Sequence, residues 1–272
     1  MRTERFDFIY LPEKYHSAHQ DCEFLLQQIE DFVSKEEFGA LKTQTIRFDE
    51  EPVLLDGEHI FDYLDRIGMQ GQHEKIIKNA ILRGMATDSV HFLQLAFHAS
   101  IQRRLTVTFA LIRKPFCYNL LVILRTFLTS DFFQQFKTTE DFDTTKLSPD
   151  DKKLLLRTSG SVISTPLDTN VLYEIIFDTT SPDSIINLSN RALHPSTTQN
   201  KVNLTGKKNL NFVFSNEENI DSQWDYLYKK LPFLLLYLNE LIECFVFGTN
   251  ELDDKLRLDR REERAEYLTR NK

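Results

Sequence analysis

The sequence contains little glycine and proline, and its cysteines form no motif. Its 272 residues include 8 glycines and 8 prolines, and a chain with so few turn-forming residues favours helix over sheet. The three cysteines, Cys22, Cys117 and Cys244, are far apart and form no CxxC motif. The sequence therefore indicates neither a zinc ribbon nor a disulfide framework. We interpret the cysteines as reduced thiols, which predicts a cytoplasmic protein.

An excess of positive charge is also missing. With 33 Lys and Arg against 41 Asp and Glu, the net charge is −8, which argues against a nucleic-acid coat protein but permits a small basic site. Charges interrupt every apolar run near the N-terminus, so we expect no signal peptide. The longest apolar run, Leu231–Phe247, contains Asn239, Glu240 and Glu243 and is shorter than a comfortable membrane span. We therefore expect a buried core helix there and no membrane association.

Motifs of the common enzyme classes are absent from the sequence as well. It has no GxSxG, Walker A, GxGxxG or EF-hand pattern, and it indicates no cofactor. His91 and His98 are seven residues apart, which is about 10 Å along a helix and too far for two ligands of one metal. We expect no metal site, and a metal-dependent hydrolase that uses these histidines is the weakest alternative.

The residues that are present predict a large helical core. Hydrophobic residues make up 41% of the chain and aromatic residues 12%, with 22 phenylalanines. We predict a mainly α protein, an irregular helical bundle with a long central helix pair and a small β element at about 170–178 and 210–214. We expect an N-terminal helical extension (1–70), a helical core (71–250) and a charged C-terminal helix or tail (251–272). The mixed charges of that last segment are typical of a solvated helix.

Residues 75–128 form the expected central helix pair. Pro115 favours a break near Arg113–Pro115. Apolar residues at helical spacing predict one inward face before the break and another after it. The first face consists of Ile81, Met85, Phe92, Leu95 and Ala99, and the second of Phe116, Leu120, Ile123, Leu124 and Phe127.

The strongest candidate for chemistry lies at the end of a short helix that Pro195 terminates. Arg191 and His194 are three residues apart, so both can project from one side of a helix. Arginine can hold a phosphate through its planar fork, and histidine can move a proton near neutral pH. The residues that we expect to bind substrate nearby are Asn190, Lys207 and Lys208. The alternative is that cations simply favour a helix C-terminus.

Two further polar groups lie in the central segment. Arg113 and Lys114 are adjacent cations at the expected break, where they and the amide groups of the next helix start could bind phosphate. Asp88, His91 and His98 form a polar stripe in which a carboxylate three residues from an imidazole can orient it. Solvated surface cations and hydrogen-bonded core histidines are the alternatives for the two groups.

Several blocks of the sequence resemble a family of bacterial helical proteins without an established activity. These blocks are Leu105–Asn119, Asn190–Thr198, Leu210–Ser215 and Trp224–Leu236. The resemblance covers roughly residues 75–250 and implies a bacterial origin and a helical fold. Arg191 and His194, with two residues between them, also resemble the Arg/His motif of HEPN proteins, which are helical bundles that act as metal-independent ribonucleases in toxin and phage-defence systems. That resemblance implies that Arg191 and His194 carry the site, paired across a dimer.

Two functions follow from these observations. The first is a defence- or toxin-type module that acts as a metal-independent ribonuclease. In it, His194 assists attack by a ribose 2′-hydroxyl and Arg191 stabilises the charge on phosphorus. The alternative is a non-catalytic helical interaction or regulatory protein that dimerises. The candidate partners are a second copy of the chain, an RNA substrate and a protein partner, and the sequence leaves open whether the protein is an enzyme.

Overall fold

The computed structural model describes residues 8, 10–48, 53–194, 196, 204–206 and 217–270, with only the backbone described for 217–219. These residues are mainly helical and include no strand, which confirms the mainly α class. The helical elements are η1 (Glu13–Tyr15), α1 (His16–Ser34), η2 (Glu36–Leu41), α2 (Ile60–Arg66), α3 (Gln70–Ile101), α4 (Leu105–Arg113), η3 (Lys114–Asn119), α5 (Leu120–Leu128), α6 (Phe132–Thr138), α7 (Pro149–Gly160), α8 (Thr169–Ile176), α9 (Ile185–Leu193), α10 (Glu217–Thr249) and α11 (Asp254–Arg270).

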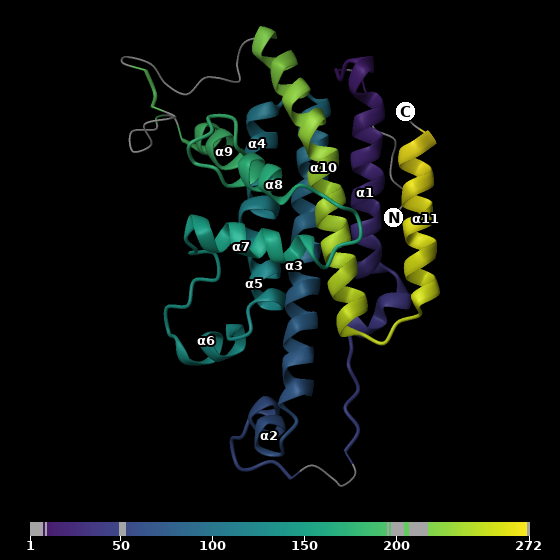
Figure 1. Cartoon of the computed structure of the whole chain (residues 1–272), viewed down its shortest axis with the longest axis vertical. Helices are drawn as coiled ribbons and strands as arrows, with labels where there is room; N and C mark the ends of the chain where they lie inside the picture. The colour runs from purple at the N-terminus through teal and green to yellow at the C-terminus, as the bar shows by residue number, and fades with distance from the viewer. Residues whose placement is uncertain are drawn as a thin grey trace.

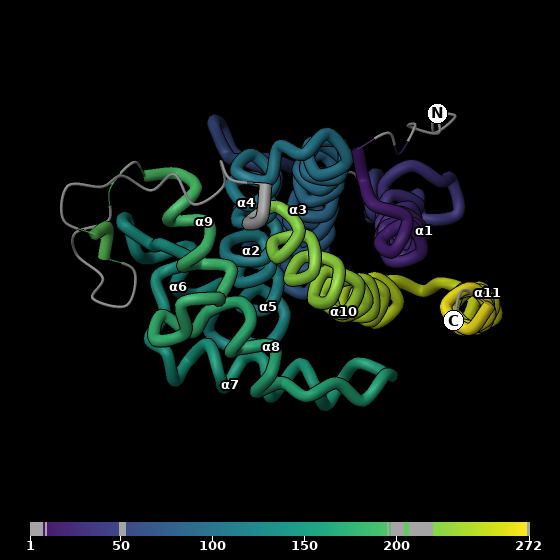
Figure 2. The backbone as a smooth tube through the Cα atoms, turned by 90° about the horizontal axis from the view of Figure 1, so that it is seen from above, coloured from purple at the N-terminus to yellow at the C-terminus, as the bar shows by residue number. Residues whose placement is uncertain are grey.

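The long helix α3 runs through the centre of the molecule. In Figure 1, α1, α10 and α11 lie on one side of it, the shorter helices α6 to α9 lie on the other, and α2 lies at the far end. Helix α1 packs against both α3 and α10, and α4 packs against α3 and α9. Seen from above in Figure 2, α11 lies at one edge of the molecule, beside α1 and α10. The core is therefore built around α3, α10 and α1.

The predicted central helix pair is present, but its break is not where we expected it. The chain turns at 102–104, where Arg103 has a φ of 61°, and Leu105–Leu128 is helical without interruption. Proline lacks an N–H and clashes with the carbonyl of the preceding turn in a regular helix. The structure accommodates Pro115 in the π-helical turn η3, in which the N–H of Leu120 donates to the Pro115 carbonyl five residues earlier. The predicted break at Arg113–Pro115 is therefore wrong.

Of the two predicted apolar faces, only the second is confirmed. Phe116, Leu120, Ile123 and Leu124 are all buried, and Phe127 is partly buried against the core. In α3, however, Leu95 is exposed. The residues of α3 that are buried instead include Leu82, Ala86, Val90, Leu93 and Phe97. Because α3 is enclosed by several other helices, its largest apolar residues do not mark a single inward stripe.

Residues 170–176 are helical and 177–178 form no strand, so the predicted β element there is wrong. Asp168 caps α8 by accepting hydrogen bonds from the backbone N–H groups of Asn170 and Val171, as acidic N-cap residues do. Leu172, Ile175 and Ile176 are buried at helical spacing. This burial outweighs the β-propensity of the branched residues, so the segment is a helix. The other predicted strand, 210–214, lies outside the described residues.

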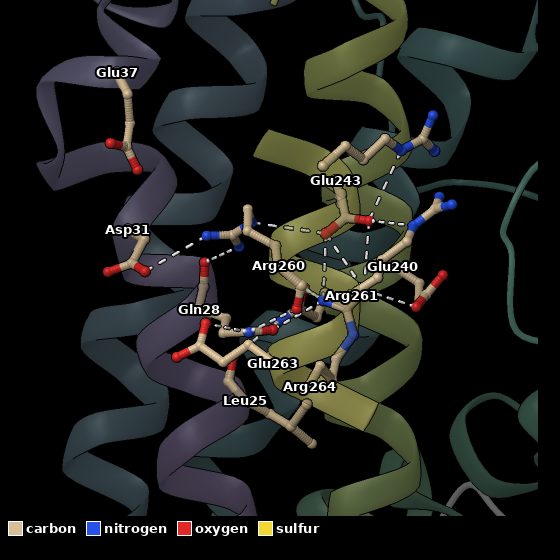
Figure 3. A network of polar contacts seen from close by, with 12 residues as sticks. Leu25, Gln28, Asp31, Glu37, Glu240, Glu243, Arg260, Arg261, Glu263 and Arg264 are labelled. Atoms are coloured by element: carbon tan, nitrogen blue, oxygen red, sulfur yellow. Dashed lines mark hydrogen bonds and ion pairs between the residues drawn. The ribbon is translucent and has the colours of Figure 1, made fainter. Parts of the chain in front are cut away.

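Helix α11 is not solvated on all sides, because two of its arginines are buried. Arg264 donates to Glu240 Oε1 at 2.9 Å and to Gln28 Oε1 at 2.8 Å. Arg260 donates to the Gln28 carbonyl at 2.7 Å and lies over the Phe32 ring at 4.1 Å. The hydrogen bonds, shown in Figure 3, join α11 to α10 and α1. The prediction of a solvated helix is therefore wrong for this face.

Glu243 is at the centre of this network and has no exposed surface. Arg261 Nε donates to it at 2.9 Å and Arg264 Nη1 at 3.3 Å, and Arg257 and Arg260 lie within 3.8 Å of its oxygens. A buried carboxylate is tolerated only where opposite charges and hydrogen bonds compensate for its lost hydration. Helix α11 supplies that compensation, which fixes its register on α10.

Two helical stretches are long and apolar enough to cross a membrane by length and composition alone. They are Leu105–Leu128 and Ile220–Thr249, and 61% and 67% of their most apolar windows are buried within the protein. Core helices of soluble proteins pass the same test, so the expected lack of membrane association stays a prediction.

We predict that Glu243→Gln destabilises the protein by about 3–5 kcal/mol, because it leaves buried arginines without their counter-charge. Chemical denaturation followed by circular dichroism measures the change. Glu266→Gln is the matched control, because Glu266 also bonds an arginine, Arg270, but is 65% exposed, and its loss costs less than about 1 kcal/mol. Equal stability of the two variants would contradict the role assigned to the network.

Candidate functional site

A surface groove of about 490 Å³ brings together several of the residues that the sequence singled out. It lies where α4 and η3 meet the end of α9, and it is lined by Ala110, Arg113, Lys114, Tyr118, Leu193 and His194. Arg113 and Lys114 are about eighty residues from His194 in the sequence. They meet in one place because α9 packs against α4. We call this feature the η3/α9 groove.

The end of α9 presents His194 at the edge of the groove. The backbone leaves the helix at this residue, with φ −115° and ψ 124°, and its N–H still donates to the Asn190 carbonyl at 3.0 Å. The next residue is Pro195, and a residue that precedes proline is held out of the helical region. The sequence thus ends the helix here, and the imidazole is exposed at that end.

Arg113 is held in the groove by two partners. Its Nη1 donates to Asn190 Oδ1, which joins α4 to α9. Its Nε donates to the hydroxyl of Tyr118 at 3.1 Å, and its guanidinium carbon lies 5.5 Å from the centre of that ring. Asn190, predicted to bind substrate, therefore positions Arg113. An arginine that is already oriented loses less side-chain entropy when it binds a ligand.

Lys114 is fixed by a carboxylate beneath it. Its Nζ donates to Asp88 Oδ1 at 2.9 Å, and Asn119 Nδ2 donates to Asp88 Oδ2 at 2.9 Å and to Ser89 Oγ at 3.0 Å. Burial raises the pKa of Asp88, but the hydrogen bonds from Lys114 and Asn119 outweigh it, and the pKa lies below its usual value. Asp88 is therefore ionised and connects α3 to η3 beneath the groove.

The π-helical turn determines which side chains reach the groove. Residues five apart point to different sides of an α-helix, whereas a π-turn forms its hydrogen bonds between such residues and brings them closer together. Arg113 and Tyr118 are five apart and in contact. Single π-turns in helices occur frequently at functional sites. Tyr118 was missed from the sequence because its spacing fits no regular helix, and Pro115 was the only local signal.

Arg191 does not line the η3/α9 groove. Its Nη2 donates to the Pro182 carbonyl at 3.0 Å, and burial lowers the pKa of its half-buried guanidinium. The structure therefore places His194, but not Arg191, in the groove. Lys207 and Lys208 lie outside the described residues.

The polar stripe of α3 divides after His91. Asp88 bonds Lys114 and, together with His91, lines a second depression of about 410 Å³. His98 shares a hydrogen bond of 2.9 Å with the side-chain amide of Gln102. In the part of the chain that the structure describes, no three His, Cys, Asp or Glu side chains are arranged to hold a metal ion.

Comparison of the chain with protein-family models, curated proteins and solved structures gives no match. The resemblances to bacterial helical proteins and to HEPN proteins therefore stay predictions. A function must therefore be proposed from the geometry of the η3/α9 groove.

We predict that Asp88→Asn destabilises the protein by about 1–2 kcal/mol at neutral pH, because a charge-assisted contact at a partly exposed site is lost. The pKa of Asp88 is lowered in the folded protein. Its contribution is therefore present above the unfolded pKa of about 4 and is lost as the pH falls through the lower folded value. Urea denaturation at several pH values measures the difference in unfolding free energy between the variant and wild type. That difference should shrink as the pH falls below about 4.

Asp141→Asn serves as the control for this measurement, because Asp141 is exposed. It should leave stability unchanged at every pH. A gap for Asp88→Asn that widens in acid would contradict the assignment.

Proposed function

We propose that the η3/α9 groove binds the phosphodiester backbone of RNA and cleaves it without a metal ion. The convergence of Arg113, Lys114 and His194 on one groove supports this proposal. It places two phosphate-binding cations next to a group that transfers protons near neutral pH. The proposal keeps the predicted reaction but replaces Arg191 with Arg113 as the arginine of the site.

The charge pattern suits one phosphate group rather than a long stretch of nucleic acid. The protein carries a net charge of −8, so an extended basic surface is not expected. Arg113 can still offer its fork of N–H groups, because Asn190 and Tyr118 use one Nη and the Nε. Lys114 adds a compact charge beside it.

The proposed reaction is an internal transfer of the phosphoryl group. His194 accepts the proton of the ribose 2′-hydroxyl as O2′ attacks phosphorus. The bond from phosphorus to O5′ breaks, O5′ takes up a proton, and a 2′,3′-cyclic phosphate remains. Arg113 and Lys114 stabilise the additional negative charge that develops on the phosphoryl oxygens. Such an activity suits the predicted defence- or toxin-type module.

We predict that His194→Ala lowers the rate of RNA cleavage by about 10²-fold or more, the usual contribution of a general acid–base residue. Purified protein is incubated with a labelled single-stranded RNA in the presence of a chelator, and products are separated on gels. His91→Ala is the matched control, because His91 is an exposed histidine that does not line the η3/α9 groove, and it should retain full activity. Cleavage that persists in His194→Ala would rule out the assignment.

We predict that Arg113→Gln weakens RNA binding and lowers the slope of log affinity against log salt by about 0.7, the value for one contact to a single strand. Fluorescence anisotropy with a 2′-O-methyl RNA, which cannot be cleaved, measures binding alone. Arg191→Gln is the control and should bind as wild type, because Arg191 does not line the groove. Weaker RNA binding by Arg191→Gln than by Arg113→Gln would indicate that Arg191, not Arg113, binds the phosphate.

A further inference from the structure

Three consecutive aliphatic side chains are exposed immediately before α2. Val53, Leu54 and Leu55 are 72%, 46% and 60% exposed. Ile60 and Ile67, at the two ends of α2, are also exposed. Single exposed apolar residues are ordinary, but a contiguous apolar surface is typical of interaction sites. We call Val53–Leu55 the aliphatic turn.

The aliphatic turn is held in place by polar contacts on both sides. Glu58 accepts a hydrogen bond from the Leu55 N–H at 2.9 Å and two from Arg66, at 2.7 and 2.8 Å. Arg66 Nη2 also donates to the Val53 carbonyl at 2.9 Å. Arg66 thus contacts the start of the turn directly and its end through Glu58. A surface that is already ordered loses less conformational entropy when it binds.

The turn belongs to a projecting part of the molecule. Helix α2 lies beyond the main body, at the end of α3 (Figure 1). Asp65 anchors it by bonding His73 Nδ1 of α3 at 2.8 Å and Lys137 Nζ of α6 at 2.7 Å. Within the described residues, α2 packs chiefly on α3. The aliphatic turn is therefore next to a helix that lies away from the main body.

The exposed charges beside the turn are acidic. Asp56 and Asp62 are exposed, and neither forms an ion pair with another described residue. The local cation Arg66 is already paired with Glu58 at 2.7 Å. Complementary charge at the edge of an interface favours the right partner and excludes others.

We propose that the aliphatic turn docks into an apolar groove of a partner protein whose edge carries Lys or Arg. An anionic membrane surface would be repelled by Asp56 and Asp62. A second copy of the chain is disfavoured because a stable dimer buries about 800 Å² per partner, more than a turn and one end of a short helix supply. The turn is independent of the η3/α9 groove. It suits an interaction protein, but one that binds a different protein rather than the dimer that the sequence analysis gave as the alternative.

The test uses the full chain and a library of random displayed peptides. Peptides selected on the wild-type protein should be rich in apolar and basic residues, and Leu55→Asp should weaken their binding about tenfold or more. The double variant Asp56→Lys with Asp62→Lys should also weaken peptide binding. The loss of affinity should be larger at low salt than at high salt, because salt screens the charges. Leu258→Asp, which changes an exposed leucine of α11, is the control and should bind as wild type.

Glu58→Gln tests whether binding depends on the conformation of the turn and not only on its apolar side chains. It leaves all three aliphatic residues in place but weakens the contacts that hold them, so binding should fall while thermal stability changes little. Selection of acidic peptides, or of none that depend on Leu55, would overturn the proposal. A dimer in light scattering that Leu55→Asp abolishes, or sedimentation with phosphatidylglycerol vesicles, would overturn it as well.

Discussion

Glu243 carries a charge in a place that water does not reach, and the arrangement of the long helices depends on how that charge is balanced. The balance comes from arginines on α11, which also bond Glu240 on α10 and Gln28 on α1. Removing one member of such a network leaves the others buried and unpaired. The network therefore specifies one register among three helices, which apolar packing alone would leave less well defined.

A second carboxylate with fixed partners, this one partly exposed, lies on α3. Asp88 on α3 holds Lys114 and Asn119 of η3, so the π-turn is attached to the central helix of the fold. This attachment sets the position of Lys114, while Asn190 of α9 sets that of Arg113. The η3/α9 groove thus lies on rigid elements, as a site that must position a phosphate requires.

Much of the fold follows from helical spacing in the sequence. Low glycine content and regular apolar residues predict the class, the central pair and the buried α10. The failures have particular causes. The π-turn accommodates Pro115, so the helix continues through it. The N-cap and buried face of α8 outweigh the β-propensity of its branched residues. Arg260 and Arg264 bond acids that lie far away in the sequence or on another helix.

The candidate site was predicted only in part for a similar reason. Residue chemistry identified Arg113, Lys114, Asn190 and His194, but nothing local to either segment shows that α4 and α9 pack together. Arg191 was assigned by its spacing to His194, and the structure instead directs it to the Pro182 carbonyl. Long-range packing, rather than spacing along one helix, decided which arginine accompanies His194.

Hydrogen–deuterium exchange of the full chain with a 2′-O-methyl RNA measures whether the η3/α9 groove binds RNA. We expect slower exchange at 105–119 and 185–194 when RNA is added, with no change in α11 or around His91. Protection confined to the depression that His91 lines, or to α11, would show that RNA binds elsewhere.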